Sequence, residues 1–597
     1  MEAAAVTADR SDAVSTVGEM LLAAAVCHRG VALQERHGDE LCEVSYPDLA
    51  AQARDVAAGL IALGVEAGDR VAIFAATCAR WTTVDYGALC AGAVVVPVYH
   101  TSSVEECAYV LAHSGATAVF CGDDAQAAVV SHARKSCPGL RHVVLLRGES
   151  VSAISFEELV RRGAVISEAI VDNRISGSAD SLATIVYTSG TTGPPKGCML
   201  THANLLATAR MYKDELAIGE GHVLYQFLPL AHVLARVAQA VVIAGGATIT
   251  FWSGDPARIV DELAERQPTH FPAVPRVYEK IHGAIVGQVQ DGSRLHRMLF
   301  AWSLAQGRRR GGGGGGERAS LRYRVAERLV LARVRSLFGD QLELGLVGAA
   351  PVAPQLLEFF AACGVPVIEG YGLTETCSVA TLNPASQPRF GSVGRALRGT
   401  EVTIADDGEI LIRGPQVFRG YYRDPTATEV ALSPDGWLHT GDLGSLSSDG
   451  YLTITGRKKD LIITSSGKNI TPVNIESELR ETRLIREAVV FGDNRPYLVA
   501  LLSPDLDQTA KLAARLGIDT GASTCANHPR VRAEIQREVD AVNQRLARIE
   551  QIKRFAILDR DLTQSDGELT PTLKVRRHAV YEKYADVFAS LYEVTPS

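Results

Sequence analysis

Short apolar runs alternate with amphipathic stretches along the first part of the chain. Tyr46–Leu63 has the apolar spacing of a helix, and the apolar run Arg70–Phe74 after it predicts a buried strand. A helical Trp81–Ala91 and the apolar run Ala93–Val98 repeat this pair. Such alternation is typical of a mostly parallel sheet covered on both faces. Further elements are predicted at Thr16–Cys27 (helix) and at Val31–Gln34, Ala118–Cys121 and Leu182–Val186 (strands).

A glycine-rich segment interrupts the middle of the chain. Arg308–Glu317 reads RRRGGGGGGE, and six consecutive glycines cannot hold regular structure. We therefore expect a flexible, solvated loop between helical stretches at Leu295–Gln306 and Leu321–Phe338. Its arginines could also touch an anionic lipid surface.

The pattern changes again near Gly456, where the paired basic residues of GRKKD precede a helix start at Thr471-Pro472. Strand-like runs and one long helical stretch follow, at Ala488–Phe491, Tyr497–Leu502 and Arg530–Ile552. The whole pattern predicts an α/β fold. A large N-terminal domain of mixed and parallel sheets with flanking helices would span residues 1–455, with a hinge at 456–460 and a small mobile α+β domain at 461–597.

Composition and charge exclude several classes of protein. A chain of 597 residues is too long for one ordinary domain, and 47% hydrophobic residues suit a well-packed globular protein. The net charge of −8 gives no basic footprint for nucleic acid. The 11 cysteines are scattered with no CxxC pair, which indicates reduced thiols in a cytoplasmic protein rather than disulfides or a zinc site.

No stretch of the sequence predicts a membrane span. The N-terminus lacks the charged-then-apolar order of a secretion signal. The longest apolar run, Ala238–Phe251, is shorter than the roughly 18 residues that a span needs. Because Gly245-Gly246 interrupts this run, a helix end, a turn and a buried strand are expected there. Any contact with a membrane would be weak and peripheral.

Candidate chemistry centres on Tyr187–Gly197, which reads YTSGTTGPPKG directly after a predicted strand. Glycines let the backbone approach a bulky anion, and hydroxyls and amides supply donors. The spacing is not that of a Walker A loop, since Pro195 stands where that motif has glycine. Phosphate binding is favoured over a plain surface loop, because the segment holds one lysine and no acid.

Four further stretches carry reactive side chains, although each also has an ordinary structural interpretation. His232 ends LPLAH and, taken alone, would most simply be a packed histidine. In EGYGLTET, Tyr371 could stack on a base and Glu375 could bind Mg²⁺. Asp442 ends GWLHTGD and could bind a ribose diol. Lys574 ends LTPTLK, where a solvated lysine is the simpler reading.

In this order, the stretches YTSGTTGPPKG, LPLAH, EGYGLTET, GWLHTGD, GRKKD and LTPTLK resemble the adenylate-forming superfamily of acyl-CoA synthetases, luciferases and peptide-synthetase adenylation domains. The resemblance covers essentially the whole chain. It is greatest to long-chain fatty acyl-CoA synthetases, because of FPAVPRVYEKI (Phe271–Ile281), the block from GWLHTGD to GRKKDLIITSSGKNI, and the terminal LTPTLKVRR.

The resemblance implies a nucleotide site. The residues that would wrap the β- and γ-phosphates of ATP share one loop: Thr188, Ser189, Gly190, Thr191, Thr192, Gly193 and Lys196. The residues that would frame adenine lie in two later segments: Gly348, Ala349, Ala350, Tyr371 and Gly372. Asp442 and Arg457 would hold the ribose hydroxyls.

The resemblance also implies catalytic roles. Thr374 would contact the α-phosphate, Glu375 and Thr188 would hold Mg²⁺, and Lys574 would bridge the substrate carboxylate and the α-phosphate. His232 would lie at the acyl pocket near the carboxylate rather than act as a base. Lys459 matches the hinge position of the family. Many relatives carry Asp at the hinge position, and a basic residue is an accepted variant.

The implied activity is ATP-dependent ligation of a fatty acid to coenzyme A, through acyl-AMP and with release of pyrophosphate. Two alternatives remain open at this stage. A fatty acyl-AMP ligase would deliver the acyl group to a carrier protein, although such proteins usually carry an insertion that GRKKDLIITSSGKNI lacks. A non-catalytic relative would bind acyl groups or nucleotides only. The oligomeric state cannot be predicted.

Overall fold

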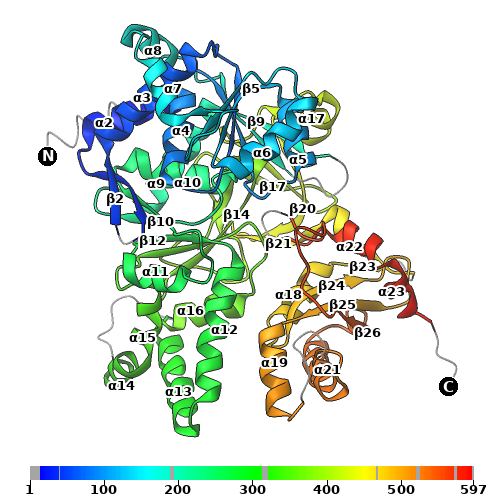
Figure 1. Cartoon of the computed structure of the whole chain (residues 1–597). Helices are drawn as coiled ribbons and strands as arrows, with labels where there is room; N and C mark the ends of the chain where they lie inside the picture. Colours follow the sequence, from blue (N-terminus) through cyan, green and yellow to red (C-terminus); the bar gives the residue numbers. More distant parts are fainter. Residues whose placement is uncertain are drawn as a thin grey trace.

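The computed structural model of the chain describes residues 14–38, 40–188, 194–311, 320–465, 468–518, 525–570 and 574–593. A large N-terminal part of sheets and helices is followed by a smaller α+β part, seen at the lower right of Figure 1. The predicted α/β fold class is confirmed. Among the described helices, none is both long and apolar enough to cross a bilayer.

The first large sheet has eight strands in the order β19-β9-β8-β4-β3-β5-β6-β7. Its centre is parallel, since β3 pairs with β4 on one side and with β5 on the other. Every residue of the Val-rich β4 is buried, as expected for a strand covered on both faces. The strands are β3 (Arg70–Phe74), β4 (Val94–Val98), β5 (Ala116–Cys121), β6 (His142–Leu145), β7 (Ile154–Ser155), β8 (Leu182–Thr188), β9 (Lys196–Thr201) and β19 (Gly420–Tyr421).

The second large sheet has nine strands in the order β16-β15-β14-β13-β12-β10-β11-β1-β2. The pairs from β1 to β14 are parallel, so their carboxyl ends meet at one edge, where ligands of such sheets bind. The strands are β1 (Val31–His37), β2 (Glu40–Ser45), β10 (Val223–Gln226), β11 (Thr248–Phe251), β12 (His270–Ala273), β13 (Leu344–Val347), β14 (Val367–Leu373), β15 (Ser378–Leu382) and β16 (Arg395–Ala396).

Helices form layers between and outside these two sheets. The main core joins both sheets through α2 (Val17–Cys27), α3 (Tyr46–Ala62), α4 (Ala79–Cys90), α9 (His202–Leu216) and α10 (Val233–Gly245), with α7 (Phe156–Gly163) and α8 (Glu168–Ile175) beside them. A second core lies under α5 (Val104–Ser114) and α6 (Asp124–Ala133). A third lies under α11 (Ile259–Arg266), α12 (Pro275–Asp291), α13 (Arg294–Gly311), α14 (Leu321–Ala326), α15 (Ala332–Arg335) and α16 (Pro354–Ala362).

A small antiparallel sheet leads from the large part into the C-terminal part. It has the order β17-β18-β20-β21, with β17 (Glu401–Ile404), β18 (Glu409–Arg413), β20 (Leu438–Leu446) and β21 (Leu452–Arg457), and α17 (Pro425–Ala431) lies beside it. A single 3₁₀ turn, η5 (Lys458–Asp460), follows β21 directly.

The C-terminal part has its own core, in which helices pack on the sheet β24-β25-β26. Its elements are β22 (Ile462–Ile463), β23 (Asn469–Ile470), α18 (Pro472–Arg480), β24 (Ile485–Phe491), β25 (Leu498–Pro504), α19 (Leu506–Arg515), α21 (Pro529–Asn543), β26 (Ile552–Ile557), α22 (Arg577–Lys583) and α23 (Ala585–Ser590).

Most predicted elements occur within a few residues of their expected bounds, and two predictions were wrong in extent. The helix expected at Arg530–Ile552 ends at Asn543, whose side chain bonds the backbone N–H and C=O of Ile552, where β26 begins. The helix expected to end at Gln306 continues to Gly311. Arginines are good helix formers and interact favourably with a helix C-terminus, so the three arginines at 308–310 extend the helix.

Candidate functional site

The predicted phosphate loop connects two antiparallel strands of the eight-stranded sheet. Thr188 at the end of β8 lies opposite Lys196 at the start of β9, and the Thr188 hydroxyl reaches the Lys196 carbonyl at 3.4 Å. The Tyr109 hydroxyl donates to the Pro195 carbonyl at 3.0 Å. The strand pairing therefore fixes both ends of the loop to the sheet, and Tyr109 also ties the second end to α5. The predicted residues between them, Ser189, Gly190, Thr191, Thr192 and Gly193, lie outside the described residues.

The segment Gly348-Ala349-Ala350 leaves β13 and passes close to β14. A Cβ atom on Gly348 would lie 2.8 Å from the carbonyl oxygen of Gly370, so the close approach requires glycine. Ala349 has φ +67°, a left-handed conformation that costs a non-glycine residue about 1–2 kcal/mol. Strained residues of this kind cluster at ligand sites. The turn stands beside the strand that carries Tyr371, as an adenine site would need.

Tyr371, Asp442 and Arg457 form one contact group. The Tyr371 hydroxyl donates to an Asp442 carboxylate oxygen at 2.8 Å, and the Arg457 Nε lies 3.4 Å from the other oxygen. Asp442 and Arg457 face each other across the β20–β21 pair. Burial raises the pKa of Asp442, while Arg457 and the Tyr371 hydrogen bond oppose that rise. The sequence motifs that hold these three residues are 71 and 15 residues apart along the chain.

Glu375 follows β14 in the 3₁₀ turn η4 (Thr374–Thr376), and it faces the phosphate loop. Its carboxylate accepts a hydrogen bond from Tyr421 at 2.7 Å, and the Lys196 ammonium lies 4.9 Å above the Tyr421 ring. Thr374 opens the same turn and is partly exposed. Gly372, just before it, is obligatory, since a Cβ there would collide with the carbonyl of Ser378.

The predicted magnesium ligands Thr188 and Glu375 both act on one buried cysteine. Burial and Glu375 raise the pKa of the Cys198 thiol, and Thr188 opposes that rise. A carboxylate and a hydroxyl are hard oxygen donors of the kind that Mg²⁺ binds together with substrate phosphates. Among the described residues there is no cluster of three or more His, Cys, Asp or Glu. The pair therefore fits a metal that is shared with a nucleotide.

His232 is the N-cap of α10, and its Nδ1 accepts the backbone N–H of Leu234 at 3.2 Å. Burial, and then the charge of Lys574, lower the pKa of His232 to about 4. The ring is therefore neutral near pH 7. With Nδ1 already used as an acceptor, Nε2 carries the proton and can only donate a hydrogen bond. The sequence resemblance implied a position at the acyl pocket near the carboxylate, and no role as a base; that placement stays a prediction.

Lys574 comes from the C-terminal part, yet its charge acts on Asp442, Arg457 and His232 of the large part. Burial lowers the pKa of the Lys574 ammonium, and the charge of Arg457 lowers it further. The charge of Asp442 opposes both effects. The residue still has access to solvent. The predicted hinge residue Lys459 is exposed in the η5 turn directly after β21. Six motifs spread from Thr188 to Lys574 thus meet at the junction of the two parts.

Sequence comparison places the chain in a family. A profile described as AMP-binding enzyme matches residues 23–422, and one described as AMP-binding enzyme C-terminal domain matches residues 459–595. The chain belongs to the AMP-binding enzyme family. Relatives named long-chain-fatty-acid–CoA ligase FadD15, from Mycobacterium bovis and Mycobacterium tuberculosis, are 39% identical over 563 residues, 92% of this chain and 92% of theirs. One named long-chain-fatty-acid–CoA ligase ACSBG2, from Xenopus laevis, is 30% identical over 94% of this chain and 82% of its own.

Solved structures share the fold of this AMP-binding enzyme along almost its whole length. ATP-bound MatB from Rhodopseudomonas palustris is 27% identical, with a TM-score of 0.70 over 96% of this chain and 100% of MatB. The adenylation domain of a carboxylate reductase from Mycobacterium chelonae has a TM-score of 0.77 over 98% of this chain and 93% of that domain. Because its sequence is only 20% identical, this second structure is evidence for the fold alone.

Three residues that the sequence motifs did not single out support the site of this AMP-binding enzyme. Glu409 on β18 accepts the backbone N–H of Gly441 at 2.7 Å, next to Asp442, and contacts the Nδ1 of His439 at 3.1 Å. The Lys458 ammonium binds the same Glu409 carboxylate at 2.7 Å. Tyr421 is the third such residue, because its hydroxyl donates a hydrogen bond to the Glu375 carboxylate. An acid in a short alternating strand looks solvent-facing in sequence, so no local signal marks Glu409.

Glu369, the first residue of EGYGLTET, was also missed. It pairs in register with Val347, the residue before Gly348, and is 7% exposed. Burial alone raises its pKa to about 8, and no donor in the described part of the chain reaches its carboxyl group. The carboxyl group is therefore mostly protonated at neutral pH, beside the turn predicted to frame adenine.

The small domain docks on the large one through α12. Arg276 forms an ion pair with Glu487 of β24 and donates to the backbone oxygen of Arg486 at 3.3 Å. Further along α12, Asp291 pairs with Arg515 of α19. In Figure 1, α12 accordingly faces the orange helices of the small domain. These contacts hold the orientation in which the charge of Lys574 acts on Asp442 and His232.

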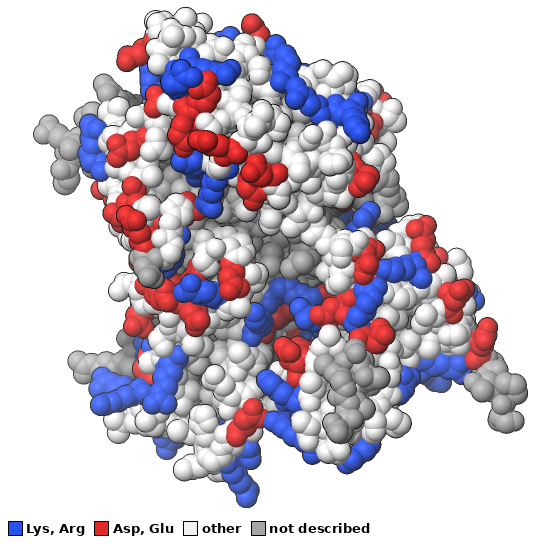
Figure 2. Space-filling view, in the orientation of Figure 1, with Lys and Arg blue, Asp and Glu red and all other residues white. Residues whose placement is uncertain are grey.

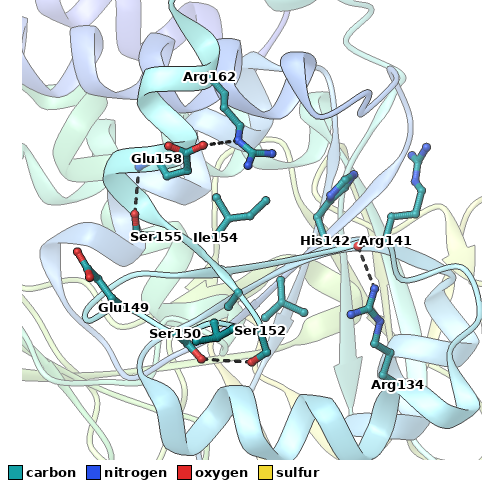
Figure 3. A pocket seen from close by; sticks show the side chains of 13 residues that line it. Arg134, Arg141, His142, Glu149, Ser150, Ser152, Ile154, Ser155, Glu158 and Arg162 are labelled. Carbon is teal, nitrogen blue, oxygen red and sulfur yellow. Dashed lines mark hydrogen bonds and ion pairs between the residues drawn. The ribbon is translucent and has the colours of Figure 1, made fainter.

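A surface cavity of about 490 Å³ is not part of this site. It lies at β6 and β7, four and five strand spacings or about 19–24 Å from β8 across the sheet. Two of its arginines are already engaged, since Arg162 binds Glu158 at 2.7 Å and Arg134 donates to the Arg141 carbonyl at 3.1 Å (Figure 3). The cavity therefore adds nothing to the nucleotide chemistry.

Proposed function

We propose that this protein is an ATP-dependent fatty acid–CoA ligase that acts on long-chain acids. The observation that carries the proposal is the position of Lys574, from the small domain, near enough to Asp442, Arg457 and His232 for their charges to interact. The names of the relatives that match it over nine-tenths of its length support the same activity. ATP and coenzyme A would be its co-substrates.

In the first half-reaction, a fatty carboxylate oxygen attacks the α-phosphorus of ATP, and pyrophosphate leaves as acyl-AMP forms. Both reactants are anionic, so the site must hold them in line against their repulsion, and orientation can supply about 7–11 kcal/mol. Lys574 would bind the carboxylate and the α-phosphate together, Thr374 would donate to the α-phosphate, and Lys196 would hold the departing phosphates. The neutral His232 would donate to the carboxylate.

Mg²⁺ bound by Glu375 and Thr188 would neutralise charge on the β- and γ-phosphates. Tyr421 would fix the Glu375 carboxylate through its 2.7 Å hydrogen bond, so that one oxygen remains directed toward the phosphates. Asp442 and Arg457 would hold the ribose, and the turn at Ala349 with Tyr371 would frame adenine. Tyr371 would keep Asp442 oriented through its hydroxyl.

In the second half-reaction, the thiolate of coenzyme A attacks the acyl carbonyl of acyl-AMP, and AMP leaves as the thioester forms. Lys574 has no role in this step. We therefore infer a hinge at residues 456–460, with Lys459 as the residue that changes conformation. The small domain, residues 461–597, would turn away from the domain of residues 1–455 between the two half-reactions.

The acyl chain would follow α10 into the large domain. An apolar cavity of about 30 Å³ lies between α9, α10 and the nine-stranded sheet. Leu234 and Ala238 line it two and six residues beyond His232, and Phe271 lines the opposite side. About one water would fit such a volume. The side chains must therefore move apart to admit a long chain, and the apolar lining would then favour one.

Release of AMP that requires both a fatty acid and coenzyme A would test the proposal. A fatty acyl-AMP ligase would instead form acyl-AMP and pass it to a carrier protein with no response to coenzyme A. A non-catalytic relative would bind ATP without pyrophosphate release. Ranking a series of acids from short to very long by kcat/KM would test the long-chain preference. The cytoplasmic location and a weak peripheral membrane contact remain proposals, each testable by cell fractionation.

A further inference from the structure

One basic and apolar face of the large domain lies away from the nucleotide site. Residues 294–335 contain eleven arginines and two glutamates, in a chain whose net charge is −8. One of those glutamates, Glu327, is engaged by Arg335. Figure 2 shows basic side chains, separated by uncharged surface, at the lower left, where Figure 1 places α13 and α14.

Apolar side chains lie on this face in a regular row. Leu321, Val325 and Leu329 follow one another at intervals of four residues along α14 and the π-helical turn after it. They are 77%, 42% and 43% exposed. Single exposed apolar residues are ordinary, but three on successive turns form a stripe. On the neighbouring helix α13, Met298 is 61% exposed as well.

Arginines flank the stripe on both sides. Arg322, Arg324 and Arg328 are all exposed, and no carboxylate in the described part of the chain pairs with them. We call these three arginines with Leu321, Val325 and Leu329 the α14 surface. Arg308 and Arg309 at the end of α13 are also exposed and add further positive charge to this face.

We propose that the α14 surface docks the protein on an anionic lipid bilayer. The arginines match lipid phosphates, and the apolar row between them would enter the boundary between headgroups and acyl chains, as in interfacial amphipathic helices. Charge alone would also suit a nucleic acid. The exposed leucines and valine favour lipid, because a nucleic acid backbone gives them nothing to bury against. The proposal does not depend on the catalytic assignment.

The test measures partitioning of the full-length protein onto vesicles. Vesicles of phosphatidylcholine alone are compared with vesicles that also contain phosphatidylglycerol, each at low and at high salt. Wild-type protein should bind the anionic vesicles more tightly, and salt should weaken that binding. Equal binding to both vesicle types, or binding that salt does not change, would overturn the proposal. So would equally tight binding to duplex DNA at the same salt.

Variants separate the charge from the apolar row. R322Q/R324Q/R328Q should bind anionic vesicles on the order of a hundredfold more weakly, since each arginine near such a surface contributes about fivefold. L321Q/V325Q/L329Q should lose at least about tenfold. The matched control R36Q/R398Q/R548Q removes three exposed arginines elsewhere and should stay within a few-fold of wild type. Unchanged thermal unfolding checks the fold of each variant. A surface variant that binds like wild type, or a control that loses as much, would refute the assignment.

Discussion

Substituting Arg276 by alanine should separate the two half-reactions. Arg276 lies on α12 and pairs with Glu487 of the small domain, whose side chain is only 4% exposed. Without Arg276, Glu487 keeps only the more distant Arg480, at 3.7 Å. Removing one partner of a fully buried pair costs about 3–5 kcal/mol. Since the Arg276 side chain is 30% exposed and Arg480 remains, we expect about 2 kcal/mol.

That energy applies to the docked orientation, in which Lys574 reaches the nucleotide site. About 2 kcal/mol shifts the ratio of docked to undocked protein roughly 30-fold. If each half-reaction follows the population of its own orientation, the ratio of the adenylation rate to the thioester rate falls by the same factor, whichever orientation predominates in the wild type. Fatty-acid-dependent ATP–pyrophosphate exchange measures the first rate. Single-turnover reaction of preformed acyl-AMP with coenzyme A measures the second.

The control is R515A, which removes the second interdomain ion pair. Arg515 and Asp291 are 51% and 55% exposed, so their pair should contribute no more than about 1 kcal/mol and change the ratio less than about fivefold. Equal loss of both rates in R276A would mean that the substitution damages the site instead of shifting the domains. An R515A effect as large as that of R276A would contradict the reasoning from burial.

Three further predictions concern single residues. Lys574→Ala should lower acyl-AMP formation by about 10²–10³ and leave the thioester step nearly unchanged; pyrophosphate exchange at the wild-type rate would rule out its assigned role. Glu409→Ala should raise the KM for ATP about tenfold, because the Gly441-Asp442 turn loses the acceptor that fixes it. Glu409→Gln should raise the KM less, and an unchanged KM in Glu409→Ala would show that the turn holds without Glu409. Glu369, with its pKa raised to about 8, keeps its proton in the folded state but loses it on unfolding above pH 4.5, so wild-type stability falls as pH rises between these values. Compared with Glu369→Gln, the wild-type large domain should lose about 2 kcal/mol of unfolding free energy between pH 5.5 and pH 7.5 in denaturant titrations, and a constant difference would disprove the buried protonated acid.

Sequence reasoning located the residues that stand on glycine-marked turns and missed those that act through tertiary contacts. Thr188, Tyr371 and Asp442 occur in motifs whose glycines and hydroxyls are unusual for their length, so the pattern itself pointed to them. Glu409 and Lys458 became visible only once β18, β20 and β21 were folded together. Glu409 and Lys458 bind partners up to 51 positions away, and local periodicity contains no information about such distant partners.

The bounds of helices and strands, like the site residues, were predicted where the local pattern determines them and missed where a tertiary contact does. Buried strands such as β3 and β4 were predicted nearly to the residue, because continuous apolar runs between turns have few alternatives. The end of α21 was not predicted, since helical periodicity continues past Asn543, and the side-chain bonds from Asn543 to Ile552 that mark the helix end depend on a residue nine positions away. The assignments of individual site residues, and the domain bounds, stay predictions for the experiments above.

The β20–β21 pair places Asp442 opposite Arg457, and the hinge turn begins at the very next residue. If these two side chains hold the ribose as proposed, the grip on the nucleotide and the axis of domain rotation share one stretch of backbone. Ribose hydroxyls would then act as an orientation signal as well as a binding group. A nucleotide without its 2′- and 3′-hydroxyls would occupy the adenine pocket but leave the small domain free to choose either orientation. AMP departure and the return of the small domain would, by the same coupling, be a single event in the turnover cycle.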